Sequence, residues 1–219
     1  MKKRFMGKGV ITALFLCVLL IVSICLAGNA AAAADDMPVV DNGIPVVYLY
    51  IDESQGTIED MMTSPDHSTY CYGKLTIDVP EGFHYSDFPD LACVSFEDLD
   101  MSIRGRGNSS WAGMWGKSPY NIKFGVKQKP FGLTKGKKWC LIANAQRGSM
   151  MANAIGMKAA RMVGTDGANH VVPVELYVND EYRGSYTFTE KVGISNNSID
   201  IDETTSVLLE LDSYFDETY

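Results

Sequence analysis

One stretch decides how this chain is interpreted: Arg104-Gly105-Arg106-Gly107-Asn108-Ser109-Ser110-Trp111. It follows Leu99, Met101 and Ile103, which alternate with polar residues as in a half-buried strand, so a strand runs into a turn. The glycines let the backbone bend and approach a ligand closely, while the arginines and small polar side chains supply hydrogen-bond donors that suit phosphate. The turn is therefore either an anion site or a surface turn with solvated arginines.

Further strands are predicted on both sides of this turn. Apolar runs and alternation indicate strands at 46–51, 70–79, 92–96, 99–104, 120–124, 139–143, 172–178, 182–188 and 207–211. One helix is predicted over residues 149–163, and its Met151, Ile155 and Met162 are expected to pack on the sheet. The expected fold class is α+β, with a mostly antiparallel β-sheet and one main helix.

The first 34 residues are typical of a secretory signal peptide. A basic start is followed by an apolar run and by small residues that suit cleavage near Ala34. A retained membrane anchor is the alternative, since the apolar run is close to the length that spans a bilayer. Cleavage predicts a secreted or cell-surface protein with no stable membrane span, and residues 35–219 are long enough for one domain.

Net charge and the cysteines limit the classes of partner, disulfide and metal site that the chain can have. The chain has 27 Asp and Glu against 19 Lys and Arg, a net charge of −8, which argues against nucleic acid as a partner. Of the cysteines after the leader, Cys71 and Cys93 are predicted to pair, and Cys140, in an apolar run, should be a buried thiol. No Cys/His cluster suggests a metal site.

Two other features could serve a nucleotide. Lys123 lies on the strand face opposite to Ile122 and Phe124, one strand beyond the glycine-rich turn, a layout that can hold nucleotide phosphates. A solvated strand lysine is the alternative. Glu210 and Asp212 share one face at a strand end and could hold a divalent cation, although such a pair is more often simply exposed.

Five segments in this order resemble the spore-coat protein H (CotH) family of atypical protein kinases. They are Ile103-Arg-Gly-Arg-Gly-Asn-Ser-Ser-Trp111, Lys117-Ser-Pro-Tyr-Asn-Ile-Lys-Phe124, Lys138-Trp-Cys-Leu-Ile-Ala-Asn144, the segment 174–192, and Leu208-Leu-Glu-Leu-Asp212. The resemblance covers about residues 98–219. It implies an atypical protein-kinase-like fold, with an N-lobe and the start of a C-lobe, preceded by a β-rich lead-in at 35–97.

The resemblance also implies roles for particular residues. The phosphate-covering turn would be formed by Arg104, Gly105, Arg106, Gly107, Asn108 and Ser109. Lys123 would be the phosphate lysine, and Glu190 would lie near an adenine-side hinge. Asp212 would be a catalytic or metal-binding carboxylate, with Glu210 beside it as a metal ligand. The implied cofactors are ATP and Mg²⁺, and the implied partner is a protein substrate on the cell or spore surface.

Two features depart from the family pattern. The family usually has an Asp ahead of the helix and an Arg-Asn pair within it, and of these only the Asn remains, as Asn153. The helix also contains no Asp or Glu, so Glu175 or Glu190 would have to replace the helix acid of ordinary kinases as the partner of Lys123. The chain also stops at Tyr219, where the family would continue, so the domain is expected to be incomplete. Two functions are compatible with these observations: an exported CotH-like kinase that transfers the ATP γ-phosphate to Ser or Thr of surface or spore-coat proteins, or a noncatalytic surface or coat interaction protein with the same fold.

Overall fold

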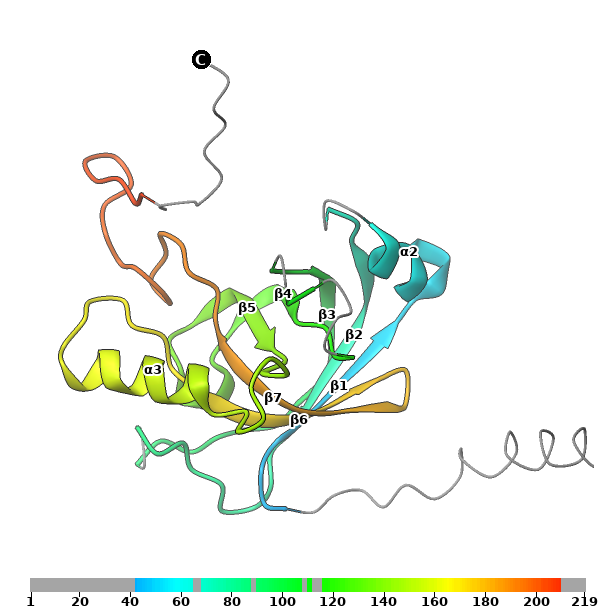
Figure 1. Ribbon diagram of the computed structural model, residues 1–219, viewed down its shortest axis with the longest axis horizontal. Helices are drawn as coiled ribbons and strands as arrows, with labels where there is room; N and C mark the ends of the chain where they lie inside the picture. The colour runs from blue at the N-terminus through cyan, green and yellow to red at the C-terminus, as the bar shows by residue number, and fades with distance from the viewer. Residues whose placement is uncertain (1–41, 65–67, 88–89, 108–109, 112–115, 210–219) are drawn as a thin grey trace, which may run out of the picture. The chain divides into compact units, whose positions relative to one another are not determined.

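Seven β-strands form the framework of the chain in the computed structural model (Figure 1). The structure describes residues 42–64, 68–87, 90–107, 110–111 and 116–209. The strands are β1 (Val46–Ile51), β2 (Cys71–Asp78), β3 (Phe96–Gly105), β4 (Tyr120–Gln128), β5 (Gly136–Ile142), β6 (Val172–Val178) and β7 (Glu181–Glu190). The helices are α2 (Ile58–Thr63), α3 (Ala152–Met162) and the short 3-10 helices η1 (Glu53–Gln55) and η2 (Pro130–Gly132).

The strands close into a barrel in the order β1-β2-β3-β4-β5-β7-β6. Every neighbouring pair is antiparallel except β1 and β6, whose parallel pairing closes the barrel. Closure gives each strand a hydrogen-bonded neighbour on both sides. The barrel takes strands from both sides of residue 97, because β1 and β2 belong to the 35–97 segment.

The core lies inside the barrel because apolar side chains alternate along each strand. Its fully buried members include Val47, Leu49, Leu75, Ile77, Ile103, Ile122, Phe124, Trp139, Leu141, Val174, Leu176 and Phe188. Phe131 of η2 adds an edge-on contact with Phe188, with 5.2 Å between ring centroids. The polar residues that alternate with this set therefore lie on the outer face of the barrel.

The predicted α+β class with mostly antiparallel strands is confirmed, whereas the division into kinase lobes is not confirmed by this barrel. The segments 92–96 and 99–104 form one strand that begins at Phe96, rather than two strands. Of the predicted strand at 207–211, residues 207–209 form no strand, and residues 210 and 211 lie outside the described residues. The predicted signal peptide, Asn108, Ser109, Glu210 and Asp212 lie outside the described residues.

The prediction that α3 packs on the sheet through Met151, Ile155 and Met162 is wrong. Ile155 is 63% exposed and Met162 79% exposed, and no residue of α3 is buried. The helix begins at Ala152 and is held instead by polar side chains: Asn153 bonds to Asn144, and Lys158 and Arg161 pair with Asp87. Spacing located the helix, but its least exposed side carries Ala154, Met157, Ala160 and Arg161, not Met151, Ile155 and Met162.

The cysteines also differ from expectation. Cys71, Cys93 and Cys140 are all free, so the predicted pair of Cys71 and Cys93 is wrong. The Cys71 side chain points into the barrel core and its Sγ donates to the carbonyl oxygen of Thr57, 3.1 Å away. Cys140 is a buried thiol, as predicted.

Candidate functional site

A row of polar side chains crosses four neighbouring strands on the outer face of the barrel. Arg104 lies opposite Asn121, Asn121 opposite Cys140, and Cys140 opposite Thr189. These residues point outward because their chain neighbours Ile103, Ile122 and Phe188 fill the core. The row lies on one side of a cavity of about 590 Å³, here called the floor cavity.

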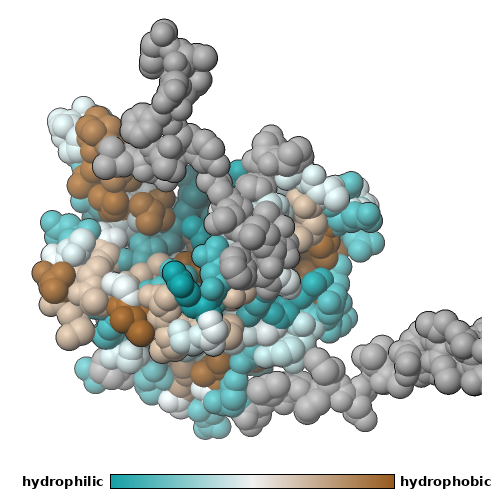
Figure 2. Space-filling view, viewed as in Figure 1, coloured by the Kyte–Doolittle hydropathy of each residue, from teal (hydrophilic) through white to brown (hydrophobic). Residues whose placement is uncertain are grey.

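The floor cavity is bounded on its other side by apolar residues near the end of the described chain, including Val192, Leu208 and Leu209. On the face shown in Figure 2, teal polar surface lies in a hollow beside the brown apolar surface of the C-terminal segment. The cavity therefore offers polar groups on the barrel side and apolar groups on the side of the segment that follows β7.

A second cavity of about 430 Å³, here called the basic cavity, adjoins the first, since Arg106, Ile142 and Met157 line both. Its polar lining consists of cations, amides and one hydroxyl: Arg106, Lys117, Arg147, Asn144, Gln146, Asn153 and Ser110. None of its described lining residues is an Asp or Glu. In a chain with a net charge of −8, three cations gathered without a carboxylate indicate an anion site.

The N-terminus of α3 opens onto the basic cavity, which Ala152 and Asn153 help to line. No side chain caps this end of the helix, and its first turn contains no acidic residue. The first backbone N–H groups of a helix have no partner within the helix and carry a partial positive charge. They therefore add backbone donors to the three cations.

Lys117 lies in the connection between β3 and β4 and is held against β7. Its Nζ donates to the carbonyl oxygen of Ser185 and lies 4.3 Å from the centre of the Tyr186 ring. Gly184 leaves room for it, because a Cβ there would lie 3.3 Å from Nζ. Burial lowers the pKa of Lys117 below its usual value, and Glu175 partly opposes this effect.

The glycine-rich turn is shaped by its own tryptophan. A Cβ on Gly105 would lie 2.7 Å from the Trp111 ring, so the ring needs glycine at this position. Gly107 has a φ of 80°, in the left-handed region that favours glycine. The turn thus folds back on itself and presents Arg106 at the junction of the two cavities.

Glu190 and its neighbours on β7 are hydrogen-bonded to other residues of the chain. The Glu190 carboxylate accepts from the His170 backbone N–H at 2.9 Å and lies 2.6 Å from His170 Nδ1. Asn169 Nδ2 donates to the Glu190 carbonyl oxygen at 2.6 Å and to Thr189 Oγ1 at 3.0 Å. The Lys191 N–H donates to the carbonyl oxygen of Lys138. Glu190, which is only 4% exposed, therefore orders the wall of the floor cavity.

The structure brings some of the predicted site residues together and places others apart. Arg104, Gly105, Arg106, Gly107 and Glu190 all line the floor cavity. Lys123 is exposed one row further along the same outer face, opposite Lys138, and lines neither cavity. No ion pair joins Lys123 to Glu175 or Glu190 in the described structure, because Glu175 accepts from Tyr182 and Glu190 is bonded to His170.

Sequence reasoning missed several lining residues. Lys117 and Asn144 lie inside the segments quoted for the family resemblance, but they were not assigned a role. Asn144, Asn153 and Arg147 come directly after β5 or at the start of α3, where a loop and a helix end meet. A cluster of cations and amides at a strand end, with no acid nearby, is the signal that could have identified them.

Comparison with known proteins identifies the family of the chain. The model of the family described as CotH kinase protein matches residues 103–218, more than half of the 219-residue chain. A search of curated proteins returns no match. The matched region includes all the residues that line either cavity, from Arg104 to Leu209. The chain therefore belongs to the CotH kinase protein family.

Proposed function

We propose that the two cavities bind ATP, and that this chain carries the nucleotide-binding part of a CotH-like atypical protein kinase. The reaction is transfer of the γ-phosphate to Ser or Thr of surface or spore-coat proteins. Phosphoryl transfer depends mainly on positioning and neutralising the triphosphate, so converging cations and backbone donors are the parts it requires.

The observation that carries this proposal is the lining of the basic cavity. Arg106, Lys117 and Arg147 converge there with the uncapped N-terminus of α3, and no described lining residue is acidic. Triphosphate oxygens accept hydrogen bonds from such groups. The adjoining floor cavity, with polar strand side chains and apolar Val192 and Leu208, has the mixed character that suits a base and ribose.

The described residues alone do not supply a complete site for a divalent cation. They contain no group of three or more His, Cys, Asp or Glu side chains that could hold a metal ion. The proposed ligands are Asp212 and Glu210, which lie outside the described residues but follow Leu208 and Leu209, which line the floor cavity. Mg²⁺ bound there would neutralise phosphate charge, and Arg106 and Lys117 would hold the remaining oxygens.

The cellular setting is part of the same proposal. The leader pattern of residues 1–34 supports export, and hence a secreted or cell-surface protein that meets its protein substrate outside the cytoplasm. Within the described ranges, no helix is both long and apolar enough to cross a membrane. The proposed domain is the segment 98–219, preceded by the 35–97 segment that supplies β1 and β2.

Calorimetric titration of ATP, with and without Mg²⁺, tests the proposal. Arg106→Gln should weaken ATP binding by about 1–3 kcal/mol, the size of a lost charge-assisted hydrogen bond. Lys127→Gln is the matched control, because Lys127 is exposed on β4 and lines neither cavity. Absence of ATP binding to the wild-type chain would contradict the proposal.

A second assay separates binding from catalysis. The chain is incubated with γ-labelled ATP, Mg²⁺ and extracted surface or coat proteins, and label on Ser or Thr is measured. ATP binding without transfer in this assay would favour the noncatalytic interaction protein over the kinase.

A further inference from the structure

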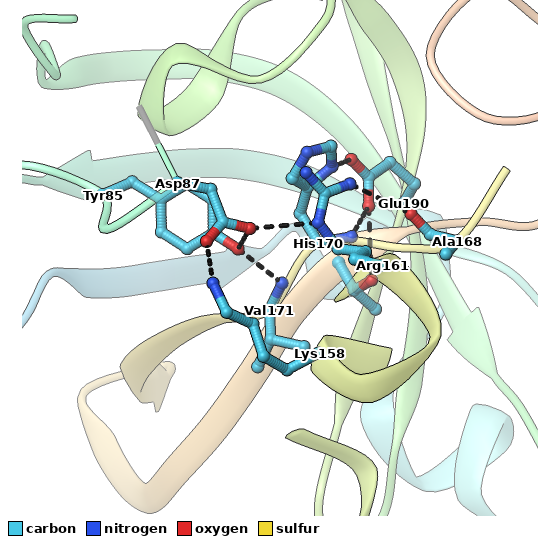
Figure 3. Close-up of polar contacts among 9 residues, drawn as sticks. Tyr85, Asp87, Lys158, Arg161, Ala168, His170, Val171 and Glu190 are labelled. Carbon is cyan, nitrogen blue, oxygen red and sulfur yellow. Dashed lines mark hydrogen bonds and ion pairs between the residues drawn. The ribbon is translucent and has the colours of Figure 1, made fainter. Parts of the chain in front are cut away.

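Asp87 holds a cluster of side chains from three parts of the chain (Figure 3). It lies in the connection between β2 and β3, and its side chain is only 8% exposed. Lys158 Nζ and Arg161 Nε of α3 both pair with its carboxylate, the latter at 3.0 Å, and the Tyr85 hydroxyl donates to it at 3.2 Å. A single carboxylate therefore joins α3 to the barrel.

This carboxylate remains charged in the folded chain. Burial raises the pKa of Asp87, but hydrogen bonds and charge attraction from Lys158, Tyr85 and Arg161 outweigh burial and hold the pKa below its usual value. No residue of α3 is fully buried, and Ala154, Met157, Ala160 and Arg161 are half-buried. The two ion pairs of Asp87 add fixed contacts in the second half of the helix, and partners of a buried charge are costly to remove.

The Asp87 cluster is connected to the basic cavity through α3. Asn153 and Met157 lie on this helix and line the cavity. Asn153 Nδ2 donates to Asn144 Oδ1 at 2.9 Å, and Asn144 Nδ2 donates to Thr187 Oγ1 on β7 at 2.8 Å. A shift of α3 would therefore move the helix N-terminus and the amides that line the cavity.

A second chain of contacts reaches the floor cavity. Arg161 Nη1 donates to the carbonyl oxygen of Ala168 at 3.3 Å, and the Val171 N–H donates to the Tyr85 hydroxyl at 3.0 Å. Both ends of the 168–171 segment are thereby attached to the side chains that bind Asp87. Between them, Asn169 and His170 make the bonds to Glu190 described above.

We propose that Asp87 is a positioning residue for the nucleotide site: it sets the place of the α3 N-terminus and of the 168–171 segment, and thereby the affinity for ATP. This inference rests on the proposed function of the cavities. Asp87 itself lines neither cavity. α3 contains no Asp or Glu, so the carboxylate that pairs with its Lys158 and Arg161 comes from outside the helix.

The experiment compares Asp87→Asn, Asp87→Glu and Lys158→Gln with Asp100→Asn. The last is the matched control, because it breaks the exposed Lys74–Asp100 pair, which lies at neither cavity. Asp87→Asn should weaken ATP binding about fivefold or more, Lys158→Gln should weaken it less, and Asp87→Glu, which keeps the charge, should stay within about twofold of wild type. Asp100→Asn should bind as wild type does.

Two further measurements separate positioning from loss of stability. Amide hydrogen exchange of α3 should become faster in Asp87→Asn while exchange in β3 and β4 stays slow. In a double-mutant cycle, Asp87→Asn should weaken binding less in an Asn153→Ala background than in wild type, because Asp87 acts partly through Asn153. If Asp87→Asn does not fold, Lys158→Gln, at a half-exposed position, is used in the same cycle.

The outcomes distinguish the two proposals. A wild-type chain that does not bind ATP contradicts the proposed function. A wild-type chain that binds ATP, with Asp87→Asn binding equally well, overturns the positioning role alone. Weakened binding in Asp87→Glu equal to that in Asp87→Asn, or effects that add fully in the cycle, would also overturn it.

Discussion

Two lysines compete for the role of phosphate ligand, and replacing each with methionine decides between them. The family resemblance assigns the role to Lys123, whereas the structure places Lys117 in the basic cavity and Lys123 outside both cavities. Methionine keeps most of the aliphatic length and removes the charge. We expect Lys117→Met to weaken ATP binding about tenfold, or about 1.4 kcal/mol, and Lys123→Met to leave it unchanged.

The expected effects on folding also differ. Lys117→Met loses a charged hydrogen bond to Ser185, worth about 1.5–3 kcal/mol, and a cation–π contact with Tyr186, worth about 0.5–2 kcal/mol. Relief from burying a charge offsets part of this loss, so the free energy of unfolding should fall by about 1–3 kcal/mol. Lys123→Met should leave it equal or slightly higher, since Lys123 lies directly opposite Lys138 and like charges there repel.

Urea denaturation measures the free energy of unfolding, and calorimetric titration measures the affinity for ATP. The pH dependence adds a check, because burial lowers the pKa of Lys117. Lys117 loses its charge as pH rises through that lowered pKa, so its part of the ATP affinity should vanish at a lower pH than an exposed lysine's would. ATP binding that weakens in Lys123→Met and not in Lys117→Met would refute this reasoning and restore the assignment from resemblance.

Three other predictions concern the glycine-rich turn, Tyr85 and the cysteines. Gly105→Ala should destabilise the chain by about 1–3 kcal/mol in urea, because its Cβ would overlap the rigid Trp111 ring; a change near zero would contradict the turn geometry. Burial raises the pKa of Tyr85 to about 12, so the folded chain keeps this proton longer than the unfolded chain. Stability should therefore be complete below pH 10 and fall as pH rises from 10 to 12, by up to about 2–3 kcal/mol, and the fall should be smaller in Tyr85→Phe. Alkylation under denaturing, nonreducing conditions should label Cys71, Cys93 and Cys140; a disulfide-linked peptide containing Cys71 would contradict the free thiols.

Part of the site could be predicted because it depends on local sequence. The glycine-rich turn was identified from two glycines and two arginines that follow an alternating strand, and its residues Arg104 to Gly107 do line the floor cavity. Arg147 and Asn153 could not be assigned in this way. They reach the basic cavity only because the loop after β5 and the start of α3 return to the glycine-rich turn.

The position of α3 shows a second limit of sequence patterns. Helical spacing of Met151, Ile155 and Met162 located the helix to within a few residues, but it did not reveal which side contacts the barrel. The half-buried side carries Ala154, Met157, Ala160 and Arg161, and Asp87, which pairs with Lys158 and Arg161, lies 71 residues before Lys158 in the chain. An ion pair between such distant segments leaves no periodic signal in either of them.

The amino-acid sequence by itself determined most of the strands, the fold class and the family. Strands β1 and β6 begin and end at the residues that alternation predicted, because the side-chain period of a strand is a local property of the chain. Only the tertiary structure decided that β1 pairs in parallel with β6 to close a barrel, and that Lys117 rather than Lys123 lies in the basic cavity. Those outcomes depend on which distant segments meet, and side-chain periodicity shows that a face is apolar without showing what lies against it.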